Sequence, residues 1–159
     1  MPITRADALK GRDKTFSEEY TQEIEDNLDR TIELVNEFLT GFTGPVQVNS
    51  GWRPAAVNSA TPGAAPQSKH LLGLAVDLND PNRAIMRYIL ENLEKASDLG
   101  LYFEDFRHTT TLRNGKIVGH WAHIQVGAPK SRKRIFVPSA SLAPDPTAWN
   151  GKYDSRHDK

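Results

Sequence analysis

Three side chains of the sequence have the types and the spacing that suit a metal centre. His70 and Asp77 lie seven residues apart, and within residues 73–78 small residues share the carboxylate's side of a predicted strand. His123 lies in a second alternating run, residues 119–126, which is also typical of a strand. A catalytic zinc site takes three protein ligands and keeps one position for water, whereas four protein ligands close a structural site. Two imidazoles and one carboxylate, with no fourth protein ligand in view, therefore predict a catalytic site with one Zn²⁺ per chain.

Each of these side chains also has an ordinary explanation. His70 alone fits a loop histidine, and His123 alone fits a buried histidine whose hydrogen bonds are satisfied. Asp77 is harder to explain in this way, because leucine and valine flank it. A carboxylate on the inner face of a strand costs free energy unless it is paired or bound to a metal. The metal site is favoured because all three residues occur together with suitable neighbours.

The composition excludes several classes of protein and of site. A chain of 159 residues fits one domain. Its 20 Lys and Arg balance 20 Asp and Glu, so no net charge attracts nucleic acid or a membrane, and nothing requires more than a monomer. The absence of cysteine excludes disulfides, a cysteine nucleophile and thiolate ligands, so nitrogen and oxygen must hold any metal. The N-terminus has no apolar signal region and no segment reaches membrane-spanning length, which predicts a chain that is cytoplasmic at synthesis.

Periodicity and turn residues predict a mixture of helices and strands. One helix is expected from a capping box at Thr15–Glu18 to about Leu39, and a second from Asp80 and Pro81 to Leu99. Strands are expected over 45–50, 73–78, 101–104 and 119–126, with a hairpin at Asn114-Gly115, an edge strand over 135–137 and a loop over 55–67. Residues 1–14 are expected to be a polar, partly ordered N-terminal arm, 15–138 a single domain, and 139–159 a C-terminal tail that lies on the surface or is disordered.

Three motifs, found in one order along the chain, carry a resemblance to a known family. They are Ser50-Gly51-Trp52-Arg53-Pro54, Ser68-x-His70-x2-Gly73-x-Ala75-x-Asp77 and Trp121-x-His123. Together they resemble the zinc D-alanyl-D-alanine carboxypeptidase and endopeptidase family, which shares its fold with the hedgehog signalling domain and includes many bacteriophage lysins. The resemblance runs from about Gly44 to Val126, and Ile3-Thr4-Arg5 with the acidic first helix is similar to small phage members. It implies an α+β fold with a small antiparallel sheet and helices packed on one side.

The same resemblance implies a function and a set of roles. The protein would be a zinc peptidase that hydrolyses stem or cross-link peptides of bacterial peptidoglycan. The zinc ligands would be His70, Asp77 and His123. Arg53 would contact the substrate and steady the oxyanion, since a fixed cation stabilises charge that appears only in the transition state. Ser68 would orient a ligand, and Trp121 would line the substrate cleft unless it belongs to the core.

The general base is the point at which the sequence departs from this family. Better-known members have an acidic residue three positions before the last zinc histidine, and this chain has His120 there. The base is then His120 or a carboxylate at the end of the strand over 101–104, either Glu104 or Asp105. We favour Glu104, because a carboxylate matches zinc-bound water, whose pKa falls to about 7. The departure leaves two alternatives: a virion-associated or structural zinc module with little catalysis, and a non-catalytic domain that binds peptide.

Overall fold

The computed structural model describes residues 2–62, 64–130 and 132–136. Its helices are α1 (Arg5–Leu9), α2 (Arg12–Thr15), α3 (Gln22–Phe38), α4 (Ala55–Ala60), α5 (Ala84–Glu91) and α6 (Leu93–Asp98), with 3-10 turns η1 (Lys69–Leu72) and η2 (Phe106–His108). Its strands are β1 (Val48–Ser50), β2 (Ala75–Asn79), β3 (Leu101–Glu104), β4 (Thr110–Arg113), β5 (Lys116–Val126) and β6 (Ile135–Phe136). The tail predicted for 139–159 lies outside the described residues, and the division of the chain into arm, domain and tail stays a prediction.

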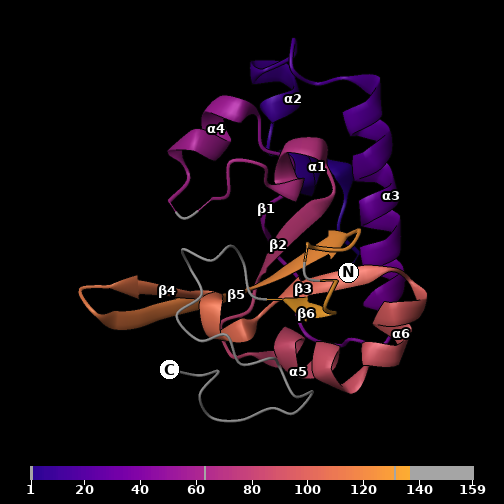
Figure 1. Cartoon of the computed structure of the whole chain (residues 1–159), viewed down its shortest axis with the longest axis vertical. Coiled ribbons are helices and arrows are strands. Elements are labelled where there is room, and N and C mark those ends of the chain that lie inside the picture. Colours follow the sequence, from indigo (N-terminus) through magenta and orange to yellow (C-terminus); the bar gives the residue numbers. More distant parts are fainter. Residues whose placement is uncertain (1, 63, 131, 137–159) are drawn as a thin grey trace.

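The strands form one sheet in the order β1-β2-β5-β3-β6, and β4 pairs with the outer part of β5 (Figure 1). Every pairing is antiparallel except that of β3 with the short β6, which is parallel and makes the sheet mixed. The hairpin predicted between β4 and β5 is confirmed. Its turn residues Asn114 and Gly115 have φ angles of 52° and 74°, the positive values that a tight two-residue turn requires.

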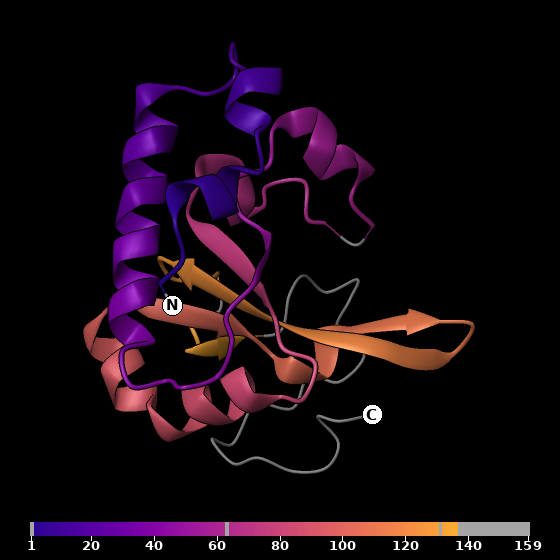
Figure 2. The same cartoon turned by 180° about the vertical axis from the view of Figure 1, so that it is seen from behind.

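One face of the sheet is apolar and is covered by helices. Alternate residues of the central strands form this face: Val76, Leu78, Leu101, Phe103, Ala122 and Ile124. They pack with buried side chains of α3, α5 and α6, among them Val35, Phe38, Ile85, Met86 and Ala96. Figure 2 shows these three helices around the central strands, with the β4–β5 hairpin projecting away from them. The expected α+β fold with helices packed on one side is confirmed, and the opposite face of the same strands is free for polar side chains.

The N-terminal residues are more ordered than the sequence predicted. Residues expected to be a partly ordered arm form α1 and α2, and Ile3 and Ala8 are buried. Asn36 of α3 accepts a hydrogen bond from the backbone N–H of Ile3 and donates one to its carbonyl. A side chain at Gly51 would collide with the backbone of Ala8, so this glycine lets α1 pack directly against the end of β1. The sequence did not indicate these two helices because the apolar residues of this segment are too few to show a helical period.

Two further predictions are wrong in their limits. The capping box expected at Thr15–Glu18 does not open α3, which begins at Gln22 with Thr21 as its N-cap. A capping box forms instead at the start of α1, between Thr4 and Asp7. Part of the loop expected over 55–67 is helix α4.

The second predicted helix is two helices that meet at Asn92. Asp80 caps α5 from outside the helix, because its carboxylate accepts the backbone N–H groups of Ile85 at 2.8 Å and Met86 at 2.9 Å. Among the residues that the structure describes, no helix combines the length and the apolar character needed to cross a bilayer.

Candidate metal centre

A row of polar side chains crosses the sheet on the face opposite the helices. The register pairs Ser50 with Asp77 and Asp77 with His123. The next pairing runs from Phe103 to Ile124, so Glu104 comes one step further along, beside His123. Residues opposite one another on neighbouring strands point to the same face. Four strands therefore bring Ser50, Asp77, His123 and Glu104 into one line, although they are far apart in the sequence.

His70 reaches this row from the short turn η1, just before β2. The Ser68 hydroxyl accepts the backbone N–H of His70 at 3.2 Å, and Gly73 ends the turn with a φ of 75°. The imidazole is 1% exposed, and its Nδ1 donates to the carbonyl of Gly51 at 2.7 Å. Nε2 then carries the lone pair. It lies 3.2 Å from Asp77 Oδ2 and makes no hydrogen bond.

His123 is oriented by a residue that the sequence analysis did not single out. The side chain of Gln125 donates through Nε2 to the carbonyl of Gly127 at 2.9 Å, which turns its Oε1 toward His123. His123 Nε2 lies 2.9 Å from that oxygen and must donate to it. His123 Nδ1 lies 2.9 Å from Asp77 Oδ1. The alternation of the predicted strand already placed Gln125 on the face of His123, which was the signal that could have found it.

Three ligand atoms thus converge without enough protons between them. One atom of each of His70, Asp77 and His123 lies within 4.8 Å of the others. If both imidazoles were neutral, His70 Nε2 and His123 Nδ1 would present lone pairs to the carboxylate, so three acceptors would face one another unless a proton or a metal ion lay among them. A divalent metal ion fits this donor set of two nitrogens and a carboxylate. The buried Nε2 of His70, which makes no hydrogen bond, is the clearest sign of the fit.

The titration of these groups reflects the same arrangement. Burial by itself lowers the pKa of His123, but the hydrogen bond and charge of Asp77, with Glu104 nearby, raise it to about 9. A proton on His123 then takes the place of a metal. Burial lowers the pKa of His70, and Asp77 opposes this only in part. Burial alone raises the pKa of Asp77, but His70 and His123 outweigh it and hold that pKa well below the ordinary carboxyl range.

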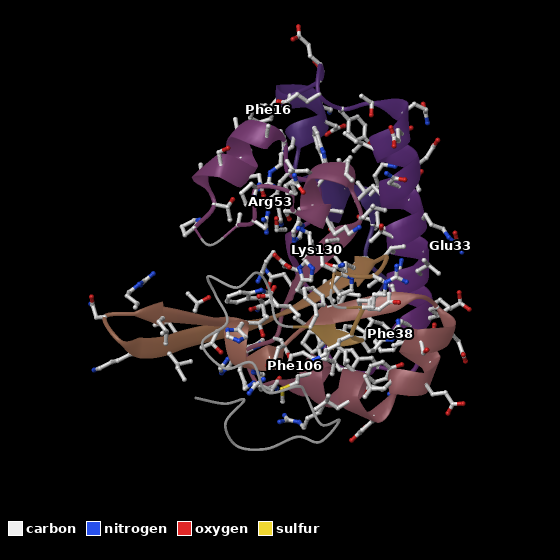
Figure 3. All side chains as sticks on the ribbon, viewed as in Figure 1. Phe16, Glu33, Phe38, Arg53, Phe106 and Lys130 are labelled. Carbon is white, nitrogen blue, oxygen red and sulfur yellow. The ribbon has the colours of Figure 1, made fainter. Side chains whose placement is uncertain are left out.

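Arg53 joins the cluster from the segment between β1 and α4, where Figure 3 labels it. Its Nη2 donates to Asp77 Oδ2 at 3.0 Å, and its Nε donates to the hydroxyl of Ser50 at 3.0 Å. Its Nη1 donates at 3.2 Å to the side-chain oxygen of Asn58, a buried residue of α4. The sequence analysis missed Asn58 because it assigned these residues to a loop. The guanidinium is 7% exposed, so its charge lies beside the candidate ligands in a place that excludes most water.

The three candidate bases lie in different surroundings. Glu104 is on the face of His123, and its pKa is raised to about 7, first by burial and then by Asp77, while His123 and Arg53 oppose the rise. Asp105 is fully buried and accepts two hydrogen bonds from the guanidinium of Arg107, at 2.9 and 2.7 Å.

His120 lies three residues before His123 in β5, so strand alternation turns its side chain to the opposite face. Its Nδ1 lies 2.9 Å from the hydroxyl of Thr110. Of the three candidate bases, only Glu104 stands beside the candidate metal ligands.

The two tryptophans of the sequence motifs have different positions. Trp121 pairs with Asn79 in the register and shares the face of His123, where it is half-buried. Trp52 is 1% exposed, donates through Nε1 to the carbonyl of Leu71, and packs its ring 5.2 Å from that of Tyr20. Trp52 is therefore a core residue, whereas Trp121 lies on the side of the sheet that carries the candidate site.

Replacing Gln125 by Leu is expected to weaken metal binding about 10- to 100-fold, the usual loss when a partner that orients a ligand is removed. Without Oε1, His123 is free to adopt the tautomer whose Nδ1 carries the proton. Titration of the apo protein with metal against a chelator of known affinity measures the loss. Gln47→Leu, at an exposed position, is the matched control. Equal affinities for the two variants would show that Gln125 does not orient His123.

Comparison with known proteins gives the relationship of the chain. Residues 6–110 match the family model described as peptidase M15. No curated protein matches the chain. Among solved structures the chain is similar to an L-Ala D-Glu endopeptidase, ChiX of Serratia marcescens, with 21% identity, coverage of 67% of this chain and 88% of that chain, and a TM-score of 0.43. The match to the family model takes in more than half of the 159 residues and confirms the relationship that the three motifs predicted, so the protein belongs to the peptidase M15 family.

Proposed function

We propose that the protein is a zinc-dependent peptidase that hydrolyses peptide bonds in the stem or cross-link peptides of bacterial peptidoglycan. The observation that carries the proposal is the buried convergence of His70 Nε2, Asp77 and His123 Nδ1, next to a carboxylate whose pKa is raised to about 7. Membership in the peptidase M15 family supports peptide hydrolysis. The resemblance of the three sequence motifs to the D-alanyl-D-alanine carboxypeptidase and endopeptidase family supports the substrate class. A phage origin is part of the same proposal.

Zinc is the metal that the donor set favours. Two imidazole nitrogens and one carboxylate oxygen are the protein ligands of many catalytic zinc sites, and they leave one position for water. When bound, the metal supplies a Lewis acid that polarises the scissile carbonyl and lowers the pKa of water to about 7. His70 and His123 would hold the metal through Nε2 and Nδ1, because Gly51 and Gln125 occupy their other nitrogens.

Glu104 is the general base in this proposal. Its carboxylate takes a proton from the attacking water, while the water oxygen forms a bond to the carbonyl carbon. The same group then gives the proton to the amide nitrogen as the carbon–nitrogen bond breaks, so that Glu104 ends the cycle unprotonated. Burial raises the pKa of Glu104 to about 7, and a bound dication would lower it, which favours at neutral pH the unprotonated carboxylate that accepts the proton.

Arg53 binds and orients in this proposal. Its guanidinium is fixed by hydrogen bonds to Ser50, Asn58 and Asp77, so its positive charge is in place before the reaction. A preorganised cation lowers the energy of the negative charge that develops on the carbonyl oxygen. Trp121 lies on the same face as His123 and offers an aromatic surface to the substrate peptide.

A zinc module with little catalysis is the second candidate, because His120 stands where an acidic residue is expected. Purified peptidoglycan incubated with the zinc-loaded protein separates the two functions. The peptidase releases new amino groups that mass spectrometry assigns to one peptide bond, and the apo protein releases none. Stoichiometric zinc without any cleavage would favour the module, and failure to bind zinc would exclude both.

A further inference from the structure

Arg83 is a buried arginine that lies outside the candidate metal centre. It immediately precedes α5 in the left-handed conformation, with a φ of 61°, and is 2% exposed. Its Nη2 donates to the carbonyl of Phe106 at 2.7 Å and to the hydroxyl of Thr110 at 2.9 Å. Its Nη1 donates to the hydroxyl of Thr109 at 3.1 Å and to the carbonyl of Trp121 at 3.4 Å. One guanidinium thus holds two separate stretches of chain.

These two stretches lie next to Glu104 and His123, the central residues of the proposed mechanism. Phe106, labelled in Figure 3, follows Glu104 by two residues, and Trp121 precedes His123 by two residues. We propose that Arg83 is a positioning residue, which fixes the segment after Glu104 against β5 and so keeps the Glu104 carboxylate beside the metal ligands. The inference rests on the proposed function, in which Glu104 is the base.

The ladder between β3 and β5 explains why Glu104 needs support on the side of β5. The pairing of these strands ends at Phe103 and Ile124, so on this side Glu104 lies beyond the last pair, whereas on its other side it pairs with Phe136 of β6. After Glu104 the chain leaves β3 and turns through η2 before it returns as β4. Arg83 bonds to this returning segment, where the backbone N–H of Trp121 also donates to the carbonyl of Thr109 at 3.0 Å.

The backbone of Arg83 is itself anchored to β5. Its N–H donates to the carbonyl of Asp80 at 3.1 Å, and the N–H of Asp80 donates to the carbonyl of His120 at 3.0 Å. The Asp80 carboxylate also caps α5, so the start of this helix, Arg83 and β5 form one connected unit. The guanidinium therefore projects from a fixed base, which a positioning residue requires.

The four acceptors explain the choice of arginine. They are oxygens spread over two chain segments, and the planar fork of a guanidinium reaches them through two nitrogens. A lysine has a single ammonium nitrogen on a flexible stem and can satisfy only part of the set. The left-handed backbone and the buried charge of Arg83 lower the stability of the fold. Such costs are found mainly at sites where a fixed geometry serves function.

The test compares Arg83→Met, Arg83→Lys and the control Arg87→Met, which changes an exposed arginine within α5. In zinc-loaded Arg83→Met we expect kcat on a peptidoglycan peptide to fall about 10- to 100-fold, because a displacement of about 1 Å has effects of this size. KM is expected to stay within a factor of three of the wild-type value, and the zinc stoichiometry is expected to stay at one per chain. Arg83→Lys is expected to recover part of kcat. A base acts in the transition state, so its displacement lowers kcat and does not change substrate binding.

Amide hydrogen exchange provides a readout that needs no activity. In Arg83→Met, the amides of residues 106–110 are expected to exchange faster, while those of β2 keep their protection. If the wild-type protein proves inactive, faster exchange in Arg83→Met would still support the structural link made by Arg83. The failure would then lie in the proposed function. Wild-type kcat in a folded Arg83→Met, or a loss of kcat that only follows the unfolded fraction, would overturn the inference. If Arg83→Met does not fold, the same outcomes are judged in Arg83→Lys.

Discussion

Replacing Asp77 by Ala is expected to abolish metal binding and peptidase activity together. Asp77 supplies the carboxylate that faces His70, His123 and Arg53 in one buried cluster. Its removal takes away one of the three proposed ligands and leaves the Arg53 guanidinium buried without its counter-charge. Breaking a buried ion pair in this way costs about 3–5 kcal/mol, so the free energy of unfolding should fall as well. Metal content by mass spectrometry, a thermal melt and a peptidoglycan assay measure the three effects.

Two further variants make this result specific. Asp77→Asn keeps the shape of the side chain and removes its charge, and it is expected to lose the metal with a smaller loss of stability. Asp29→Asn removes a carboxylate from an exposed pair with Arg5 and should change neither metal content nor activity. Full metal occupancy in Asp77→Asn would show that this carboxylate is not a ligand, and the proposed centre would be wrong.

Replacing Glu104 by Gln is expected to lower kcat about 10²- to 10⁴-fold, the range of a lost general base. Metal content should not change, because Glu104 is not one of the three ligand groups. His120→Gln, in contrast, should retain activity within a few-fold, since that imidazole lies against Thr110 on the other face of β5. If His120→Gln lost activity and Glu104→Gln kept it, the assignment of the base would be reversed.

The raised pKa of Glu104 also predicts a pH profile. The base must be unprotonated, so kcat/KM should rise with pH through the pKa of Glu104 and be lost below it. That pKa is about 7, raised mainly by burial, and a bound dication would lower it, so the acid limb should lie at or below about pH 7. A profile of kcat/KM from pH 4 to 9 measures the limb. The limb should be absent from the residual activity of Glu104→Gln, and an unchanged limb there would assign it to another group.

The parts of the site that the sequence predicted are those fixed by local patterns. Strand alternation placed Asp77 and His123 on polar faces, and the register of β2 with β5 puts them directly opposite. The hairpin at Asn114-Gly115 was predictable because these residues accept the positive φ angles that the turn needs. The family followed from the same short-range signals, while the roles of His70, Asp77 and His123 as metal ligands stay a prediction that their convergence supports.

The parts that the sequence could not predict depend on contacts between distant segments. The N-terminal residues are helical and partly buried because α3 and the end of β1 cover them, which no local period reveals. The sequence analysis favoured Glu104 for its chemistry, but the position of this residue beside His123 depends on the register of β3 with β5, which the sequence does not reveal. Asn58 and Gln125 act through side-chain hydrogen bonds to residues of the site, and the sequence around them does not indicate these bonds.

The contact between α1 and Gly51 has a practical consequence for handling this protein. The carbonyl of Gly51 sets the proton of His70, and the neighbouring N–H of Trp52 donates to Ala8 at 3.2 Å, within the first ten residues of the chain. Trimming this end, or fusing a bulky affinity tag directly to it, would therefore be expected to shift the Gly51 carbonyl and with it the orientation of the His70 imidazole. Expression vectors that leave the first residues native would keep the ligand geometry intact.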